Sequence, residues 1–446
     1  MIPSAAPDGP AAAWPSARRA WWTIAVFFVV AVLSYSDRLV LSLLVDPVRA
    51  DLHLSDTQVS LVQGLAFAMI YSVAGLPFGR IADVFPRRVV IIAGVVIWSL
   101  STAACGYADS FAALFMARIG VGVGEAAFAP AAVSMIADSF APNRRGLAIG
   151  LLLTGMSVGS GMAIVIGGGL LEIANGGAFA GLPLLGALAP WRAVLVALGL
   201  AGTAPVLLLL TLREPLRQET EAERAHGTLR LADVLAGFRS RAVVLAPLYA
   251  AVAIVSAGDF SIQNWTPALL SRRFGFSPGE IAGTLGLVSI LVGGAGTVLG
   301  GYLSDRQGAR GGDPQRIRVA MLAATAGLLG AAIALASTGA QAIACFGIWI
   351  FMSAISGTIG ITVLQNVVPN KMRGIGTAAV SFCNVIMGMA AGTALTAVLT
   401  DHVFRDPLSV GLSMTTVTGT AGLIALLLFG RAQAGLTGAR LRRTGG

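Results

Sequence analysis

Charged side chains are scarce in this chain. Of its 446 residues only 11% are Asp, Glu, Lys or Arg, whereas 56% are hydrophobic, and the mean hydropathy is +0.81. Soluble proteins carry about a quarter charged residues, so this composition excludes a soluble enzyme as the first interpretation. Twelve membrane-spanning helices of about 20 residues each would use just over half of the chain. We therefore expect a protein that lies mostly inside a lipid bilayer.

Cysteine and histidine, the usual residues of disulfide and metal sites, are also scarce. The three cysteines, Cys105, Cys345 and Cys383, are too few and too scattered for a disulfide framework. None of the three histidines has another potential ligand at metal-site spacing. The glycines of Gly120-Val-Gly-Val-Gly124 neither follow a predicted strand nor open a predicted helix, as a nucleotide-binding loop would. We expect no metal and no bound cofactor.

The formal net charge is +9, yet the arginines lie in short clusters between hydrophobic runs, which excludes nucleic acid as the expected partner. Of the 30 Lys and Arg residues, 23 fall in loops on the side of the N-terminus and 4 in the opposite loops. Because positive residues resist translocation, this bias predicts that both termini are cytoplasmic. Nearly all of the positive residues are arginine, which is typical of proteins encoded by GC-rich bacterial genomes. Because the predicted spans are helices and not the strands of an outer-membrane barrel, we expect the bacterial inner membrane.

Hydrophobic runs divide the chain into twelve predicted spans. They begin near residues 21, 57, 89, 112, 146, 191, 243, 281, 318, 341, 375 and 410. The longest hydrophilic stretch separates span six from span seven and so divides the spans equally. The predicted organisation is a disordered cytoplasmic tail (1–20), a first half (21–212), a cytoplasmic linker (213–242), a second half (243–431) and a second cytoplasmic tail (432–446).

An internal repeat supports this division. The repeated pairs, each 222 residues apart, are Asp37 with Asp259, Ser55 with Ser277, Gln58 with Glu280, and Asp83 with Asp305. We therefore predict an all-α membrane protein with twelve transmembrane helices in two pseudo-symmetric six-helix halves. Such duplicated halves typically rock about a site near the middle of the membrane.

The loop between spans two and three carries a recognisable motif. Its sequence, Gly79-Arg-Ile-Ala-Asp-Val-Phe-Pro-Arg-Arg88, resembles the signature loop of the major facilitator superfamily, and the second half keeps part of it. The resemblance implies the major facilitator fold and a cytoplasmic gate whose charges pair in one conformation only. The alternative is a loop whose positive charge only sets the topology. The expected gate residues are Gly79, Asp83, Arg87, Arg88, Asp305 and Arg306.

Four charged residues fall inside predicted spans, Asp37 and Arg38 in span one and Arg118 and Glu125 in span four. Each charge at membrane depth costs on the order of 3 kcal/mol, so these side chains must pair or line a wet cavity. Arg118 and Glu125 share one helical stripe but lie about 10 Å apart along the axis, which favours pairing between the two spans. We interpret Asp37 and Glu125 as carboxylates that take up a proton, and Arg38 and Arg118 as their charge partners. The alternative is a static network that only fixes helix packing.

Three segments narrow the family resemblance. Tyr35-Ser-Asp-Arg38, the stretch from Asp51 to Gln58 and the stretch from Gly120 to Ala126 together look like the Spinster-like branch. Members of that branch are proton-linked carriers of lysophospholipids and sphingosine phosphates in animals, with largely undefined substrates in bacteria. The resemblance implies that the acidic residues of spans one and four are the protonation sites.

Span seven carries three polar residues, Asp259, Gln263 and Asn264, which are candidates for the substrate cavity. Pro267 removes one backbone hydrogen bond and Gly258 loosens the same stretch, so we expect a broken helix that borders the cavity. The alternative is that Gln263 and Asn264 only make hydrogen bonds between helices. Span ten has no counterpart of the charged pair in span four, which confines the expected proton chemistry to the first half.

These observations predict a proton-coupled secondary active transporter that moves an amphiphilic or lipid-like solute by alternating access. We expect it to be a monomer whose partners are the lipid bilayer and a small amphiphilic substrate. The same fold serves transporters of small organic anions and multidrug exporters, which stay alternatives, as does a non-transporting membrane sensor. An enzyme is not expected, because the spans hold no nucleophile with a base and no metal cluster.

Overall fold

The computed structural model describes residues 14–141, 144–218, 236–368 and 372–444. Much of the predicted first tail and of the linker (1–13 and 219–235) lies outside the described residues, as do the last two residues of the predicted second tail (445–446). Helix α20 runs through the rest of that second tail to Thr444. Within the described ranges the chain is helical and contains no strand, and 12 helices are long and apolar enough to cross a membrane. The largest difference between a predicted and an observed start is at span nine, predicted near 318 and observed at Asp313. The predicted all-α fold class is confirmed.

The first six spans, with the short helices between them, form the N-terminal half. Its helices are α1 (Ala17–Leu39), α2 (Val45–Leu52), α3 (Asp56–Ser60), α4 (Ala66–Val84), α5 (Arg87–Gly106), α6 (Phe111–Ala126), α7 (Phe128–Ser139), α8 (Arg145–Asn175), α9 (Pro190–Ala201) and α10 (Thr203–Leu210). Span two also contains a π-helical turn, Leu61–Leu65, between α3 and α4.

The last six spans form the C-terminal half. Its helices are α13 (Ala242–Phe274), α14 (Pro278–Val288), α15 (Gly294–Gly311), α16 (Asp313–Ala331), α17 (Gly339–Val367), α18 (Arg373–Cys383), α19 (Thr393–Val398) and α20 (Val410–Thr444). π-Helical segments interrupt spans eight and eleven, at Ser289–Gly293, Asn384–Gly392 and Leu399–Phe404.

The repeated helix-start pattern forms the same cap in both halves. Ser55 accepts a hydrogen bond from the backbone N–H of Gln58, whose side chain accepts one from the backbone N–H of Ser55. Ser277 and Glu280 make the same reciprocal pair at the start of α14. Each cap satisfies two backbone donors that have no partner inside the helix, so the predicted boxes are confirmed.

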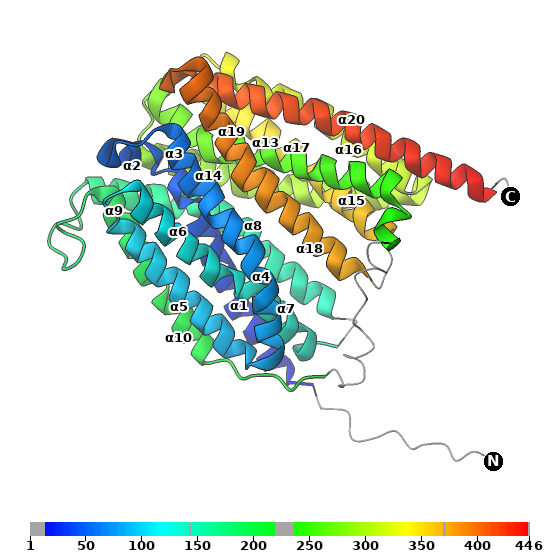
Figure 1. Cartoon of the computed structure of the whole chain (residues 1–446), viewed down its shortest axis with the longest axis horizontal. Helices are drawn as coiled ribbons and strands as arrows, with labels where there is room; N and C mark the ends of the chain where they lie inside the picture. Colours follow the sequence, from blue (N-terminus) through cyan, green and yellow to red (C-terminus); the bar gives the residue numbers. More distant parts are fainter. Residues whose placement is uncertain (1–13, 142–143, 219–235, 369–371, 445–446) are drawn as a thin grey trace.

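The two halves lie side by side and approach each other closely at one end of the bundle (Figure 1). This end carries α2 and α3, and we call it the α2 face. At the opposite end α1 begins and α20 ends, because twelve crossings bring the chain back to its starting side, and we call this end the termini face. Two large clusters of buried apolar side chains lie mainly in one half each, although Met389 of the C-terminal half joins the N-terminal cluster, and a third joins the halves near the α2 face.

Helix α13 is continuous from Ala242 to Phe274, so the expected break in span seven is wrong. Pro267 lies inside this helix, and the side chain of Thr266 donates a hydrogen bond to the carbonyl of Ile262 at 2.6 Å. Neighbouring hydroxyl groups and helices commonly make proline tolerable in membrane helices. Gly258 has a different role, because a Cβ there would lie 2.3 Å from the ring of Trp349, so glycine lets this indole pack against α13.

Candidate functional site

The four charged residues predicted in spans one and four are all buried inside the N-terminal half. Asp37 and Arg38 lie near the end of α1, and Arg118 and Glu125 lie on α6, each with at most 6% of its surface exposed. None of the four therefore faces lipid. This placement agrees with the expectation that membrane-depth charges pair or are enclosed.

Arg38 and Glu125 form an ion pair between α1 and α6. The paired oxygen, Oε2 of Glu125, also accepts a hydrogen bond from the hydroxyl of Ser34 at 2.8 Å. The other oxygen, Oε1, is buried and has no partner among the described residues. This ion pair joins spans one and four.

Three aromatic rings surround the Arg38 guanidinium. Its central carbon lies 4.5 Å from the ring centroid of Tyr35, 4.4 Å from that of Phe67 and 4.8 Å from that of Tyr71. Cation–π contacts of this kind stabilise a guanidinium that has left water. They also exclude water from the ion pair with Glu125, which strengthens the attraction between the two charges.

Asp37 occupies a different environment although it precedes Arg38 directly. Its Oδ2 accepts a hydrogen bond from Thr102 of α5 at 2.6 Å, and its Oδ1 is buried without a partner among the described residues. Arg118 donates long hydrogen bonds to the backbone carbonyls of Asp37 (3.5 Å) and Arg38 (3.4 Å). The two arginines thus differ, because Arg38 pairs with a carboxylate, whereas the hydrogen bonds of Arg118 to described residues go to backbone carbonyls.

The three polar residues predicted in span seven do not share one set of contacts. Asp259 accepts a hydrogen bond from the indole N–H of Trp349 on α17 at 2.8 Å. Asn264 donates to the hydroxyl of Thr393 on α19 at 3.1 Å, which is the interhelical role that we gave as the alternative. Gln263 is half-buried and makes no hydrogen bond with a described residue.

The predicted gate loop contributes two arginines to a network within the N-terminal half. Arg87 is 1% exposed; its Nε lies 2.7 Å from Oε1 of Glu214, and it also pairs with Asp138 of α7. Arg88 donates its backbone N–H to Oε2 of Glu214 at 2.9 Å. These contacts fasten the start of α5 to the end of α7 and to the segment after α10.

The other predicted gate residues make few contacts in this conformation. Asp83 and Asp305 are exposed and pair with no described residue, and Gly79 has open space where a Cβ would lie. Arg306 donates to the hydroxyl of Tyr302 at 3.1 Å, one turn away on the same helix. The structure therefore does not bring the six predicted gate residues together.

A charged cluster that we did not predict joins the two halves at the α2 face. Arg272, in the last turn of α13, lies 2.7 Å from Asp46 of α2 and donates two hydrogen bonds of 2.7 Å to the carboxylate of Asp56. Beside it, Asp401 accepts hydrogen bonds from the backbone N–H and the hydroxyl of Thr57, at 2.6 and 2.7 Å. Cross-half hydrogen bonds and ion pairs between described residues gather at this face.

A family model settles what kind of protein carries these features. The model of the Major Facilitator Superfamily matches residues 26–392, from span one into span eleven. The chain belongs to this superfamily. It is a multi-pass membrane transporter with 12 spans.

Known relatives of this transporter include the Spinster proteins. It is 29% identical over 418 residues to an MFS-type efflux pump of Mycolicibacterium smegmatis, with 91% of this chain and 90% of the pump covered. It is 27% identical over 411 residues to human protein spinster homolog 1, with 86% of this chain and 73% of that protein covered. The predicted similarity to the Spinster-like branch is thus confirmed.

A solved structure agrees with the fold of this transporter. A bacterial homologue of the human lysosomal transporter Spinster, in an inward-facing and unoccupied conformation, superimposes with a TM-score of 0.77. The two chains are 23% identical, and the match covers 94% of this chain and 97% of the other. The similarity confirms the major facilitator fold.

The transporter holds two further groups of site residues that the sequence analysis did not single out. Ser34 and Thr102 hydrogen-bond the two carboxylates, and Phe67 and Tyr71, one helical turn apart, face Arg38. Because Phe67 and Tyr71 are four residues apart, the sequence predicts that they lie on one face of a helix. It does not predict which cation this face contacts. Among the described residues no group of three or more His, Cys, Asp or Glu is arranged to hold a metal ion.

Proposed function

We propose that this Spinster-like transporter is a proton-coupled secondary carrier in which Asp37 and Glu125 take up the coupling proton. The observation that carries the proposal is the buried Arg38–Glu125 ion pair between α1 and α6, next to a second buried carboxylate. Each carboxylate keeps one oxygen without a described partner, which is an available place for a proton. A proton on Glu125 removes its negative charge and so frees Arg38 to bind another anion or to let α1 shift against α6.

Alternating access is supported by the unequal ends of the bundle. Arg272 and Asp401 hold the two halves together at the α2 face, which closes the molecule on that side. A rocking movement of the halves has to break these cross-half contacts before the α2 face opens. We propose that the termini face is cytoplasmic, in accord with the arginine bias, and that the membrane is the bacterial inner membrane.

The proposed substrate is an amphiphilic or lipid-like solute, and the proposed working unit is a monomer. A cation enclosed by three aromatic rings offers an anionic headgroup a charge and its neighbouring chain an apolar surface. Asp259 and Gln263 supply polar groups from the C-terminal half. The name of the mycobacterial relative favours a second candidate function, the export of small drug-like or anionic molecules by the same proton-coupled cycle.

Transport by purified protein in liposomes tests the coupling. Asp37→Asn and Glu125→Gln are expected to abolish accumulation driven by a pH gradient, whereas the exposed carboxylate variant Asp109→Asn transports like the wild type. Each variant is first shown to be monodisperse, and Glu125→Gln is repeated with Arg38→Met so that no buried charge lacks a partner. Wild-type accumulation in all of these variants would instead support the static ion-pair network.

The same liposomes distinguish the solutes. Lysophospholipids, organic anions, dyes and sugars are offered with and without an imposed pH gradient. We expect lysophospholipids to move and to require the gradient for accumulation. Gradient-driven movement of dyes or organic anions alone would replace the lipid-like substrate with the second candidate, and movement of none of these solutes would favour a sensor.

A further inference from the structure

A pocket of 390 Å³ lies at the termini face of the N-terminal half, apart from the four buried charges of α1 and α6. It is formed by the segment before α1, the first turns of α1, the end of α7 and the segment that follows α10. Because spans one and six begin and end here, the pocket lies at the level where the membrane core meets water. Its size falls within the range of small-molecule sites.

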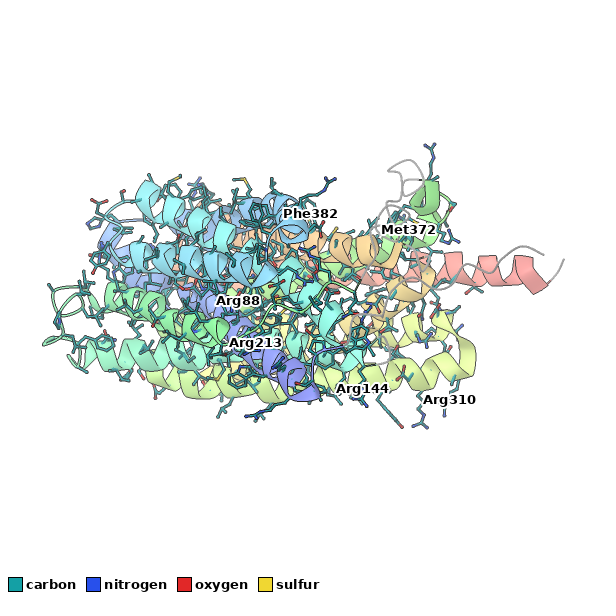
Figure 2. All side chains as sticks on the ribbon, turned by 90° about the horizontal axis from the view of Figure 1, so that it is seen from below. Arg88, Arg144, Arg213, Arg310, Met372 and Phe382 are labelled. Atoms are coloured by element: carbon teal, nitrogen blue, oxygen red, sulfur yellow. The ribbon has the colours of Figure 1, made fainter. Side chains whose placement is uncertain are left out.

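The pocket wall combines indole rings with unpaired positive charge. Trp14 and Trp22 line it and remain 40% and 45% exposed. Tryptophan at this depth is typical of the boundary between lipid headgroups and acyl chains. Arg19 and Arg213 also line the pocket, are exposed, and make no side-chain hydrogen bond or ion pair with a described residue. Figure 2 labels Arg213 in the middle part of the bundle, away from its left-hand end.

The acidic residue in this wall does not cancel that charge. Glu214 lines the pocket, but both of its oxygens already accept hydrogen bonds from Arg87 and Arg88. A further cation, Arg145, lies over the ring of Trp14, with 5.7 Å between its central carbon and the ring centroid. The pocket is therefore positive although a carboxylate lies in its wall.

The backbone adds donors to the same pocket. Ser16, the residue before α1, lines the pocket and makes no side-chain hydrogen bond to the first turn of the helix. The amide of Arg19 already donates to the carbonyl of Ser16, so the amides of Ala17 and Arg18 are the ones available to an anion. The helix dipole favours negative charge at this end. The indole of Trp22 donates to Thr211 at 2.9 Å and so fixes the distance between α1 and the end of α10.

We propose that this pocket binds the phosphate headgroup of an anionic phospholipid from the leaflet on the termini side. Arg19, Arg213 and the start of α1 bind the phosphate, while Trp14, Trp22 and the 68% exposed Leu216 contact the glycerol and the first part of the acyl chains. Basic pockets between membrane helices commonly bind headgroups of this class. The bound lipid would lie beside Glu214, which holds the gate-loop arginines, so occupancy would stabilise the fastened form of that loop.

Native mass spectrometry of the full chain, delipidated in detergent and titrated with phosphatidylglycerol or phosphatidylcholine, tests the proposal. We expect phosphatidylglycerol to bind more tightly, and the double variant Arg19→Gln/Arg213→Gln to weaken it by about fivefold for each arginine removed, since a basic residue near lipid contributes about 1 kcal/mol. The double variant with lysine at both positions should keep most of the preference, because it keeps the charge.

Arg310→Gln is the matched control, since Arg310 is also exposed near the termini face, has no described partner and lies outside the pocket. Equal binding of the two lipids would overturn the proposal. So would an equal loss in Arg310→Gln, which would mean binding to surface charge in general. Displacement of phosphatidylglycerol by millimolar inorganic phosphate would show a site for the free ion and would also overturn it.

Discussion

The two halves share a helix plan but differ in how they bury polar groups. In the N-terminal half, α1 and α6 enclose two carboxylates and two guanidinium groups. At the repeat position in the C-terminal half, Asp259 binds a neutral indole, and hydroxyl and amide groups make the remaining contacts, such as Ser256 with Asn384 at 2.8 Å. The charged residues that are buried among the described residues therefore lie in the N-terminal half, whereas the C-terminal half has the partly buried Asp259 and mainly neutral hydrogen-bonding groups.

Removing a charge from the N-terminal half should have the largest effect. Arg38→Met leaves the Glu125 carboxylate buried without its partner, and we expect a loss of about 3–5 kcal/mol in the free energy of unfolding. The double variant Arg38→Met/Glu125→Gln should recover much of this loss, because no uncompensated charge remains. Unfolding in mixed detergent measures both values. An equally unstable double variant would mean that Arg38 acts through packing on its aromatic rings and not through charge.

Much of this arrangement is predictable from the sequence, and its limits have a physical reason. Hydrophobic length alone identifies the twelve spans, and the cost of a charge in lipid identifies Asp37, Arg38, Arg118 and Glu125 as buried. Which charges meet depends on how α1 and α6 are rotated and shifted against each other, and a single sequence does not contain that information. Arg38 therefore appeared only as a general charge partner, and its specific bond to Glu125 came from the structure.

The cluster at the α2 face illustrates a different limit. Arg272 reads as a loop residue, because two arginines after a hydrophobic run normally mark the end of a span. In the structure it lies in the last turn of α13 and reaches Asp46 and Asp56, more than 200 residues earlier in the chain. Contacts between the halves have no local pattern, whereas the capping boxes involve neighbours in sequence and are recognisable.

Close contacts between helices should tolerate an added methyl group equally poorly in the two halves. Gly124 on α6 and Gly330 on α16 each lie against a backbone, since a Cβ would come within 2.5 Å of the amide nitrogen of Trp98 or Trp349. Alanine at either position should cost about 1–3 kcal/mol of stability, because backbone cannot move aside as a side chain does. Gly357→Ala, where a Cβ meets open space, is the control and should be neutral.

The two glycine variants should differ in function. Gly124→Ala also displaces the neighbouring Glu125, so it should reduce proton-driven transport more than Gly330→Ala does at matched stability. Thermal unfolding and liposome uptake on the same preparations check this expectation. Equal transport by the two variants would remove the proposed division of labour between the halves.

Neutralising Asp259 gives the smallest expected effect, and its comparison with Glu125 is the most direct test of the difference between the halves. Asp259→Asn keeps an oxygen that accepts the hydrogen bond of Trp349, so its stability should change by less than about 1 kcal/mol. Glu125→Gln changes nearly as few atoms, yet it leaves the Arg38 guanidinium buried without a counter-ion and should cost more. Equilibrium unfolding of the two variants in one detergent measures the difference. Equal losses in the free energy of unfolding would mean that Asp259 is also an ionised carboxylate paired with a positive group. The two halves would then not differ in how they bury charge.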